Sequence, residues 1–294
     1  ATMVCATGYT LSISEERNVF ACGFSDCGAH GFEEEEEPVL PAKQIPSLKN
    51  IKSIAVGAFH SVYLDENGSV FTMGLNTSGQ LGNGVSGEML NSTHIPQKVN
   101  LPPCKQISCG ATSAACLSED DNLYLLGYDC TLSFGLSDTF VPYKLSFIKD
   151  VKFIECGGNH TFCMTQNNEV YCWGDNFYGQ LGLGNTLPQK KPVLCSSLSN
   201  EDVMDIKCGI QFTIALTSNK YVLSCGDNSR SQLGRETDND KSTSFQKVED
   251  IAEIMRIGCG YSHSLCIDIN NDLYVFGYNE YGQLGLGDTD NRNK

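Results

Sequence analysis

The sequence contains six copies of one pattern, and this internal repeat constrains the fold more than any other feature. Each copy has an anchor glycine that ends a short apolar segment, such as Val170-Tyr171-Cys172-Trp173-Gly174. The anchors follow one another at intervals of 51, 53, 47, 52 and 51 residues. They are Gly23, Gly74, Gly127, Gly174, Gly226 and Gly277. Such regular spacing predicts an array of similar structural units.

Two further positions keep a fixed distance from each anchor. Fourteen residues before the anchors lie Tyr9, His60, Ser113, His160, Phe212 and His263. Eight residues after them lie Gly31, Gly82, Gly135, Gly182, Gly234 and Gly285, usually at the end of a Gly-Gln-Leu-Gly turn. We predict that the leucines of these turns are buried, namely Leu81, Leu181, Leu233 and Leu284. Length varies only between copies, so those segments hold surface loops.

Each copy contains two short apolar runs joined by a polar turn, which predicts a β-hairpin. In the second copy the runs cover residues 61–64 and 70–73, with Asp65-Glu66-Asn67-Gly68 between them. A second pair of apolar patches lies between copies and is often opened by proline. Four strands per copy are therefore expected. Because no window shows a long period of 3.6 residues, helices should be few and short.

A four-stranded unit of this size cannot bury both of its faces alone, so it stacks against its neighbours around a ring. We therefore predict an all-β chain that forms a β-propeller from six repeats of about 51 residues. The ring has six blades, or seven if the chain is incomplete. Residues 1–294 are expected to form a single propeller domain.

The Gly-x-x-His start, the Val-Tyr-x-Trp-Gly strand and the Gly-Gln-Leu-Gly-x-Gly turn together resemble the repeats of the regulator of chromosome condensation (RCC1) family. The resemblance covers nearly the whole chain and implies an RCC1-like propeller. It implies either a protein–protein interaction scaffold or a guanine nucleotide exchange factor for a Ran-like small GTPase. The family's exchange face carries acidic residues within its Gly-x-x-His segments, and here none of the intervening positions is Asp or Glu. This departure favours the scaffold.

The turns between the opening glycine and the histidine position are expected to gather on one face and to bind the partner. Aromatic side chains there would supply the anchors that dominate protein interfaces. The candidate contact residues are Tyr9, Phe59, His60, Asn159, His160, Gln211, Phe212, Tyr261, Ser262 and His263. The alternative for the histidines is a structural role, in which they hydrogen-bond to the backbone where a blade begins.

Charge limits the classes of partner. The chain has 35 acidic and 20 basic side chains, a formal net charge of −15, which repels nucleic acid and anionic lipid. No stretch is long and apolar enough to insert into a membrane. An acidic run, Glu33, Glu34, Glu35, Glu36 and Glu37, follows the first copy. It is either a solvated loop or a means of attracting a basic partner protein.

No residue pattern points to catalysis. Eleven of the 15 cysteines occupy repeat positions that carry apolar residues in other copies, and no Cys-x-x-Cys pair occurs, so we predict reduced, packed thiols. His160 and Cys163 are three residues apart on a predicted strand and would point to opposite faces. Asp175, Asp227 and Asp288 are interpreted as turn residues. We expect no catalytic or metal site, no cofactor, and a monomeric, non-enzymatic protein of the cytoplasm or nucleus.

Overall fold

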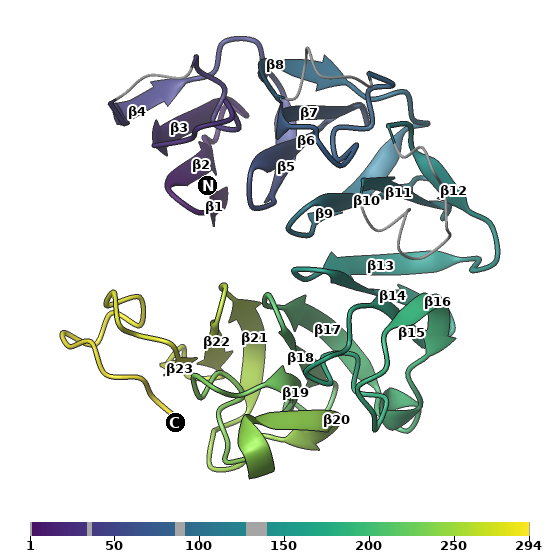
Figure 1. Cartoon of the computed structure of the whole chain (residues 1–294), viewed down its shortest axis with the longest axis vertical. Helices are drawn as coiled ribbons and strands as arrows, with labels where there is room; N and C mark the ends of the chain where they lie inside the picture. The colour runs from purple at the N-terminus through teal and green to yellow at the C-terminus, as the bar shows by residue number, and fades with distance from the viewer. Residues whose placement is uncertain (1, 34–36, 86–91, 128–139, 294) are drawn as a thin grey trace. The chain divides into compact units, whose positions relative to one another are not determined.

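Antiparallel β-sheets make up the structure, a computed structural model that describes residues 2–33, 37–85, 92–127 and 140–293. Each repeat forms one sheet, here called a blade, and the blades are numbered 1 to 6 in chain order (Figure 1). The predicted all-β propeller class with six blades is confirmed. The chain divides into two compact units, Ala1–Ile154 and Glu155–Lys294. The predictions made for Glu34, Glu35, Glu36 and Gly135 lie outside the described residues.

The first unit contains blades 1 to 3. Blade 1 consists of β1 (Thr2–Cys5), β2 (Tyr9–Ile13), β3 (Val19–Gly23) and β4 (Val39–Gln44). Blade 2 consists of β5 (Ile51–Val56), β6 (His60–Asp65), β7 (Val70–Leu75) and β8 (Ser92–Lys98). Blade 3 consists of β9 (Cys104–Cys109), β10 (Ser113–Ser118), β11 (Leu123–Gly127) and β12 (Tyr143–Leu145).

The second unit contains blades 4 to 6, and the boundary between the units falls within β13. Blade 4 consists of β13 (Val151–Cys156), β14 (His160–Thr165), β15 (Val170–Gly174) and β16 (Gln189–Leu194). Blade 5 consists of β17 (Val203–Cys208), β18 (Phe212–Thr217), β19 (Val222–Asp227) and β20 (Lys241–Lys247). Blade 6 consists of β21 (Ile254–Cys259), β22 (His263–Asp268) and β23 (Leu273–Gly277).

The strands of a blade pair in sequence order, as the hairpin pattern predicts. The second and third strands of blade 4 pair from His160 opposite Gly174 to Met164 opposite Val170. In blade 2 the turn between these strands is closed by Asp65, whose Oδ1 accepts the N–H groups of Asn67 at 2.9 Å and Ser69 at 2.7 Å. Helical structure within the described residues is limited to the 3₁₀ turns η1 (Ser196–Leu198) and η2 (Asp238–Asp240).

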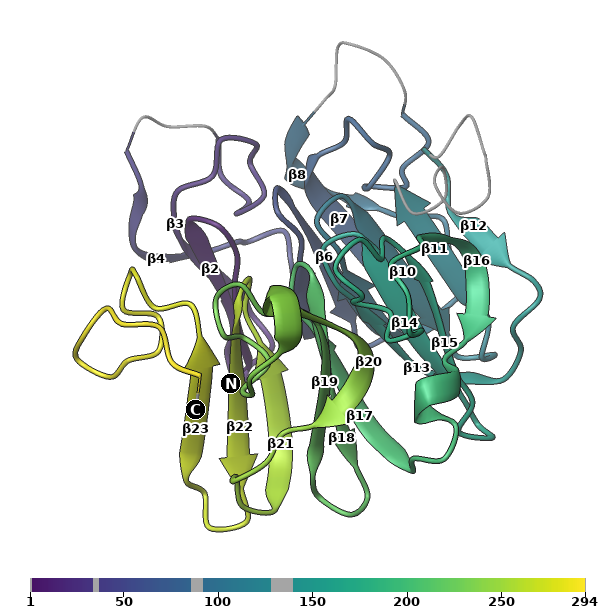
Figure 2. The same cartoon turned by 60° about the horizontal axis from the view of Figure 1, so that its bottom comes forward.

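The second strands β6, β10, β14 and β18 are buried at every position. A strand that is buried on both faces must be covered on both sides, and consecutive blades provide this cover. Within each unit consecutive blades lie side by side (Figure 2), and their first strands touch. The amide side chain of Gln106 on β9 donates to the carbonyl oxygen of Ile154 on β13 at 2.8 Å and accepts its N–H at 3.2 Å.

In blades 2, 4, 5 and 6 the loop after the third strand is held by a buried asparagine. In blade 4, Oδ1 of Asn176 accepts the N–H of Leu181 at 3.0 Å, and its Nδ2 donates to the carbonyl oxygens of Asn185 and Leu187. Equivalent asparagines accept the N–H of the turn leucine in blades 2, 5 and 6. The predicted burial of the four leucines is confirmed, with exposures of 1%, 0%, 0% and 5%. Asp175, Asp227 and Asp288 each accept an N–H two residues on, as expected of turn residues.

The opening glycine of each Gly-x-x-His segment leaves room for the ring that follows it. A Cβ on Gly157 would lie 2.2 Å from Cε1 of His160, and a Cβ on Gly209 would lie 1.9 Å from Cε1 of Phe212. Neither glycine needs a positive φ, because neither is among the residues with that conformation. The ring itself therefore requires glycine at this position.

Blade 6 differs from the expected four strands, because only three strands are present within the described residues. Gly277 forms an isolated antiparallel bridge with Arg292. The same anchor position pairs with the start of the fourth strand in blades 4 and 5, where Gly174 meets Gln189 and Gly226 meets Ser242. Arg292 therefore lies where a fourth strand begins its pairing.

Replacing Gly157 by alanine should destabilise the protein by about 1–3 kcal/mol, because the new Cβ displaces the imidazole of His160 from a packed site. Gly258 is the matched control, since a Cβ there meets nothing closer than Leu265 Cδ1 at 3.8 Å. Gly258→Ala should be neutral or slightly stabilising. Urea unfolding of both variants checks this, and equal losses in the two would contradict the steric argument.

Candidate protein-binding face

The turns that open the second strands lie beside the ends of the third strands, because the two strands are antiparallel neighbours. We call the surface formed by these turns and by the loops after the third strands the turn face. Backbone hydrogen bonds of 2.7–2.9 Å join the turn to the loop in blades 2, 4, 5 and 6. The N–H groups of Leu75, Asp175, Asp227 and Tyr278 donate to the carbonyl oxygens of Phe59, Asn159, Gln211 and Ser262, respectively. Blades 2, 4, 5 and 6 thus each contribute two adjacent segments to the turn face.

Turns of consecutive blades are also bonded to each other. In the second unit the N–H of Gly158 donates to the carbonyl oxygen of Gly209 at 3.2 Å, and the N–H of Ile210 donates to that of Tyr261 at 3.0 Å. In the first unit Ala58 donates to Ala111 at 3.2 Å. Within each unit, therefore, the turns that the sequence singles out lie next to one another.

Four of the predicted contact residues are core residues instead: Tyr9, His60, His160 and Phe212 are 3%, 0%, 1% and 0% exposed. The physical reason for His60, His160 and Phe212 is the packing of each ring over the glycine three positions earlier, and Tyr9 instead reaches the next blade with its hydroxyl. The hydroxyl of Tyr9 donates to the backbone carbonyl of His60 at 3.3 Å. These side chains hold blades together and cannot contact a partner.

The other predicted residues reach the surface to different degrees. Phe59 and Tyr261 are 46% and 67% exposed, and Asn159 is also exposed. Gln211 and His263 are half-buried, whereas Ser262 is 9% exposed. As partner contacts, the exposed members stay a prediction.

His160 links blades 4 and 5 through Thr213. Its Nε2 lies 2.9 Å from Thr213 Oγ1, and that hydroxyl lies 2.8 Å from the carbonyl oxygen of Gln180. Because the single hydroxyl proton goes to the carbonyl, Nε2 must carry a proton and donate it to Thr213. Burial lowers the pKa of this imidazole to about 3, so the ring is neutral near pH 7. For His60, burial lowers the pKa to about 4 against the opposing effect of a hydrogen bond to the backbone of Ser113.

The sequence reasoning named only Tyr261 of a cluster on the turn face of blades 5 and 6 and missed its other members. We define the Tyr–Arg patch as Arg230, Tyr261, Tyr278, Glu280 and Tyr281. The guanidinium carbon of Arg230 lies 4.9 Å from the ring centre of Tyr278, and its Nη1 is 2.8 Å from Oε1 of Glu280. The rings of Tyr278 and Tyr281 meet edge to face at 6.0 Å, and Tyr281 is 85% exposed.

The positions of these residues within the repeat could have identified this patch from the sequence. Tyr278, Glu280 and Tyr281 stand one, three and four residues after the anchor Gly277. They alternate with Asn279 and Gly282, which recur in the other copies. Positions that vary between fixed neighbours are free to carry a specific function.

The acidic run is visible at its two ends. Glu33 and Glu37 are both exposed, and Oε1 of Glu33 lies 4.0 Å from Nε2 of His94. A second charge cluster, on the first strands of the second unit, is half-buried. There Nζ of Lys207 lies 3.2 Å from Glu155 and 3.1 Å from Asp205, and burial raises the pKa of Glu155 to about 7. Because this cluster is internally paired, it supports the packing of β13 against β17.

The cysteines at the repeat positions are buried or half-buried, apart from the exposed Cys5. Burial raises the pKa of Cys163 far above its ordinary value and that of Cys266 to about 12, so both thiols are protonated and unreactive. Within the described part of the chain, no three His, Cys, Asp or Glu side chains are placed to hold a metal ion. The same residues include no helix with the length and apolarity to cross a membrane.

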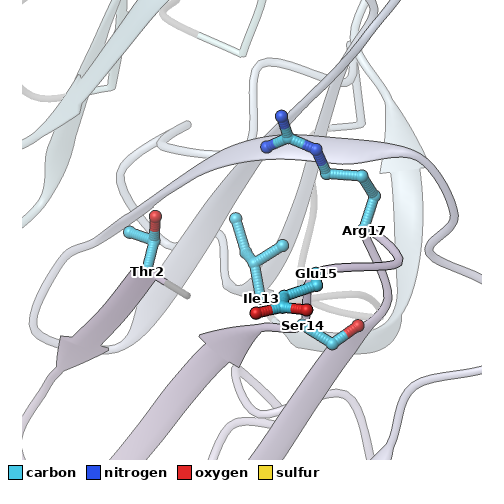
Figure 3. Close-up of a pocket in the computed structure, with 5 residues that line it drawn as sticks. All are labelled: Thr2, Ile13, Ser14, Glu15 and Arg17. Carbon is cyan, nitrogen blue, oxygen red and sulfur yellow. The ribbon is translucent and has the colours of Figure 1, made fainter.

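A cavity of about 260 Å³ lies at the turn between β2 and β3, away from the turn face (Figure 3). Thr2, Ile13, Ser14, Glu15 and Arg17 line it. The only described cation in this lining is already paired, since Nε of Arg17 lies 3.2 Å from Oε1 of Glu66. This set of groups gives no reason to assign a ligand.

The buried histidines make stability depend on pH. Because the pKa of His160 is about 3 when folded and 6.5 in an unperturbed state, the unfolded chain binds the extra proton below pH 6.5. Its contribution to the unfolding free energy should fall by about 1.4 kcal/mol for each pH unit between 6.5 and 3. His160→Phe, which copies Phe212 of blade 5, should remove this part of the slope in urea unfolding measured from pH 7 to pH 5. If the unfolding free energies of the wild type and His160→Phe depended equally on pH, His160 would not be the source of this part of the slope.

Comparison with models of known protein families identifies the same repeat. A family model described as regulator of chromosome condensation (RCC1) repeat matches residues 67–117, 167–216 and 221–267. A second model of the same description matches residues 51–80, 151–180, 203–232 and 256–283. The matched segments include the turn before the second strand in every blade from the second to the sixth. In blade 3 the match ends at residue 117, before the third strand.

Several curated proteins are similar over nearly the whole chain. The ultraviolet-B receptor UVR8 of Arabidopsis thaliana is 29% identical, with 99% of this chain and 68% of the receptor covered. The human X-linked retinitis pigmentosa GTPase regulator is 33% identical, with 96% of this chain covered. The human probable E3 ubiquitin-protein ligase HERC3 is 29% identical, with 92% of this chain covered. The chain spans only 28% of the GTPase regulator and 31% of HERC3.

Solved structures share the fold. Prp20p of Saccharomyces cerevisiae superimposes with a TM-score of 0.86 at 23% identity, covering 99% of this chain and 75% of that one. Human WBSCR16 superimposes with a TM-score of 0.87 at 22% identity, covering 100% and 80%. The repeats that the two family models match, which lie in blades 2 to 6, show that this chain belongs to the RCC1 repeat family.

Proposed function

We propose that this chain is a non-enzymatic scaffold for protein–protein interaction and that it binds a partner protein through the turn face of its second unit. The observation that carries the proposal is the Tyr–Arg patch, in which three tyrosines and an arginine are presented on adjacent loops. Tyrosine and arginine are the residue types most enriched among the side chains that dominate binding energy at protein interfaces.

The patch combines exposure with order. Tyr261 and Tyr281 are 67% and 85% exposed, so most of each ring is available for burial by a partner. Tyr278 is already held, because its hydroxyl donates to Oε2 of Glu280 at 3.1 Å while Arg230 lies against its ring. A side chain that is ordered before binding loses less conformational entropy on binding. Both properties support a hot spot on this surface.

The charge of the chain favours a basic partner. A formal net charge of −15 attracts lysine-rich and arginine-rich surfaces over several ångströms, which raises association rates at low salt. The exposed Glu33 and Glu37 add to this field. We propose that the complex forms in the cytoplasm or nucleus and involves one copy of this chain.

The chemistry of the described residues supports binding over catalysis. Burial lowers the pKa values of the histidines on the second strands and raises those of the thiols, so both kinds of group are held neutral and away from solvent. A nucleophile or general base needs access to its substrate and a pKa suited to proton transfer.

The alternative function is guanine nucleotide exchange on a Ran-like small GTPase. Prp20p, whose structure was described together with its binding to Gsp1p and histones, has the same fold. The turn face also carries carboxylates outside the Gly-x-x-His segments, among them Asp175 and Glu280, which could meet a basic surface of a GTPase. The absence of Asp and Glu between the opening glycine and the histidine position still argues for the scaffold.

Two substitutions test the proposed face. The double variant Tyr261→Ala and Tyr281→Ala should weaken partner binding at least tenfold, since each hot-spot residue contributes about 2 kcal/mol or more. Leu273→Ala is the matched control, because Leu273 is 57% exposed but lies at the far end of β23 from the turn face. Cross-linking followed by quantitative mass spectrometry should recover the same partner with the wild type and the control but not with the double variant. Recovery by all three would place binding elsewhere.

Release of a fluorescent guanine nucleotide from Ran and from a panel of Rho and Rab GTPases separates the two functions. The scaffold should leave release rates unchanged at micromolar concentration. An acceleration of about a hundredfold that disappears in the double variant would instead establish exchange activity on the same face.

A further inference from the structure

Arg235 is a buried cation without an acidic partner. Its side chain is 8% exposed, and its guanidinium donates to Ser224 Oγ at 3.0 Å, to the Ser224 carbonyl oxygen at 2.9 Å and to Gln246 Oε1 at 3.1 Å. All three acceptors are uncharged. No ion pair among the described residues includes Arg235. A buried charge without a counter-ion is costly, so the structure leaves this guanidinium short of a negative group.

The repeat does not require arginine here. Arg235 directly follows the Gly-Gln-Leu-Gly position of blade 5, and the same place holds Leu183 in blade 4 and Leu286 in blade 6. A leucine at this site is therefore compatible with the blade. The charge must be explained by something other than the fold.

A polar cavity of about 390 Å³ opens beside Arg235, between the loop of residues 235–238 and β20. Lys241 supplies a second cation, and Thr237, Thr243 and Ser244 supply hydroxyl groups to its lining, whereas the hydroxyl of Ser242 already donates to the carbonyl oxygen of Ser244 at 2.9 Å. Backbone with positive φ at Asn239 and Asp240 turns the chain from the loop into β20. Two cations and these hydroxyl groups line the same cavity, together with the carboxylates of Glu236 and Asp238.

We propose that this cavity binds a phosphoryl group. A guanidinium has five N–H groups, and the three hydrogen bonds described above leave two for a ligand. Hydrogen bonds from arginine and lysine to phosphate oxygens are charge-assisted, and the hydroxyl groups complete an oxyanion shell. The cavity is larger than one phosphate, so it accommodates either the free ion or the phosphoryl group of a phosphoserine side chain.

Two carboxylates act against the ligand. Glu236 and Asp238 also line the cavity, but both are exposed, so solvent and salt screen them. Arg235 is buried, where a charge interacts more strongly. The site therefore binds a phosphoryl group through Arg235 while Glu236 weakens the binding.

Isothermal titration of the full chain tests this inference with two probes, inorganic phosphate and the peptide Gly-Gly-phosphoserine-Gly-Gly. At least one probe should bind at concentrations up to about 10 mM. Arg235→Leu, which copies blades 4 and 6, should weaken binding about tenfold or more. Glu236→Gln should strengthen it, an opposite shift that a general loss of structure cannot produce. Circular dichroism and thermal unfolding verify that both variants fold.

The two probes distinguish the source of the phosphoryl group. Binding of the peptide at least tenfold tighter than the ion assigns the site to a phosphorylated segment, and equal binding assigns it to the free ion. Lys220→Gln, which changes a lysine outside the cavity paired with Glu253, should leave both affinities unchanged. The inference is overturned if neither probe binds, or if Arg235→Leu binds as tightly as the wild type.

Discussion

The packing of a ring over a residue without a side chain is the contact on which the rest of this structure depends. The opening glycine of each Gly-x-x-His segment lets His160, Phe212 or His263 lie directly on the main chain. From there the ring reaches the next blade, as His160 does through Thr213. The spacing between consecutive blades, and with it the burial of the second strands, follows from this contact.

The same arrangement separates residues that build the fold from residues that are free to vary. Asn279 and Leu284 are tied to the loop or packed beneath it, whereas Tyr278 and Tyr281 stand between such positions and face outward. A propeller can thus change its binding surface without disturbing its core. Arg235 shows that a buried position can vary between copies as well, because blades 4 and 6 carry leucine at the same place.

Much of the fold was predictable from the sequence, because the repeat fixes the strands, the turns and the buried leucines at known offsets. The direction of a side chain was not. His60, His160 and Phe212 occupy the positions that open the turn face, yet their rings point inward, since the glycine three positions earlier offers them a contact that no single-repeat pattern reveals. The Tyr–Arg patch was missed for the converse reason: its members come from two blades, and only the structure shows that Arg230 and Tyr278 meet.

The link from His160 through Thr213 to the Gln180 carbonyl joins one repeat to the next. It therefore ties the evolutionary history of one repeat to that of its neighbour. In blade 4 the histidine meets Thr213, one residue past the ring position of the following copy, whereas the same place after His60 holds Ala114. A change at His160 is therefore expected to be accompanied by a change at Thr213 in the neighbouring copy.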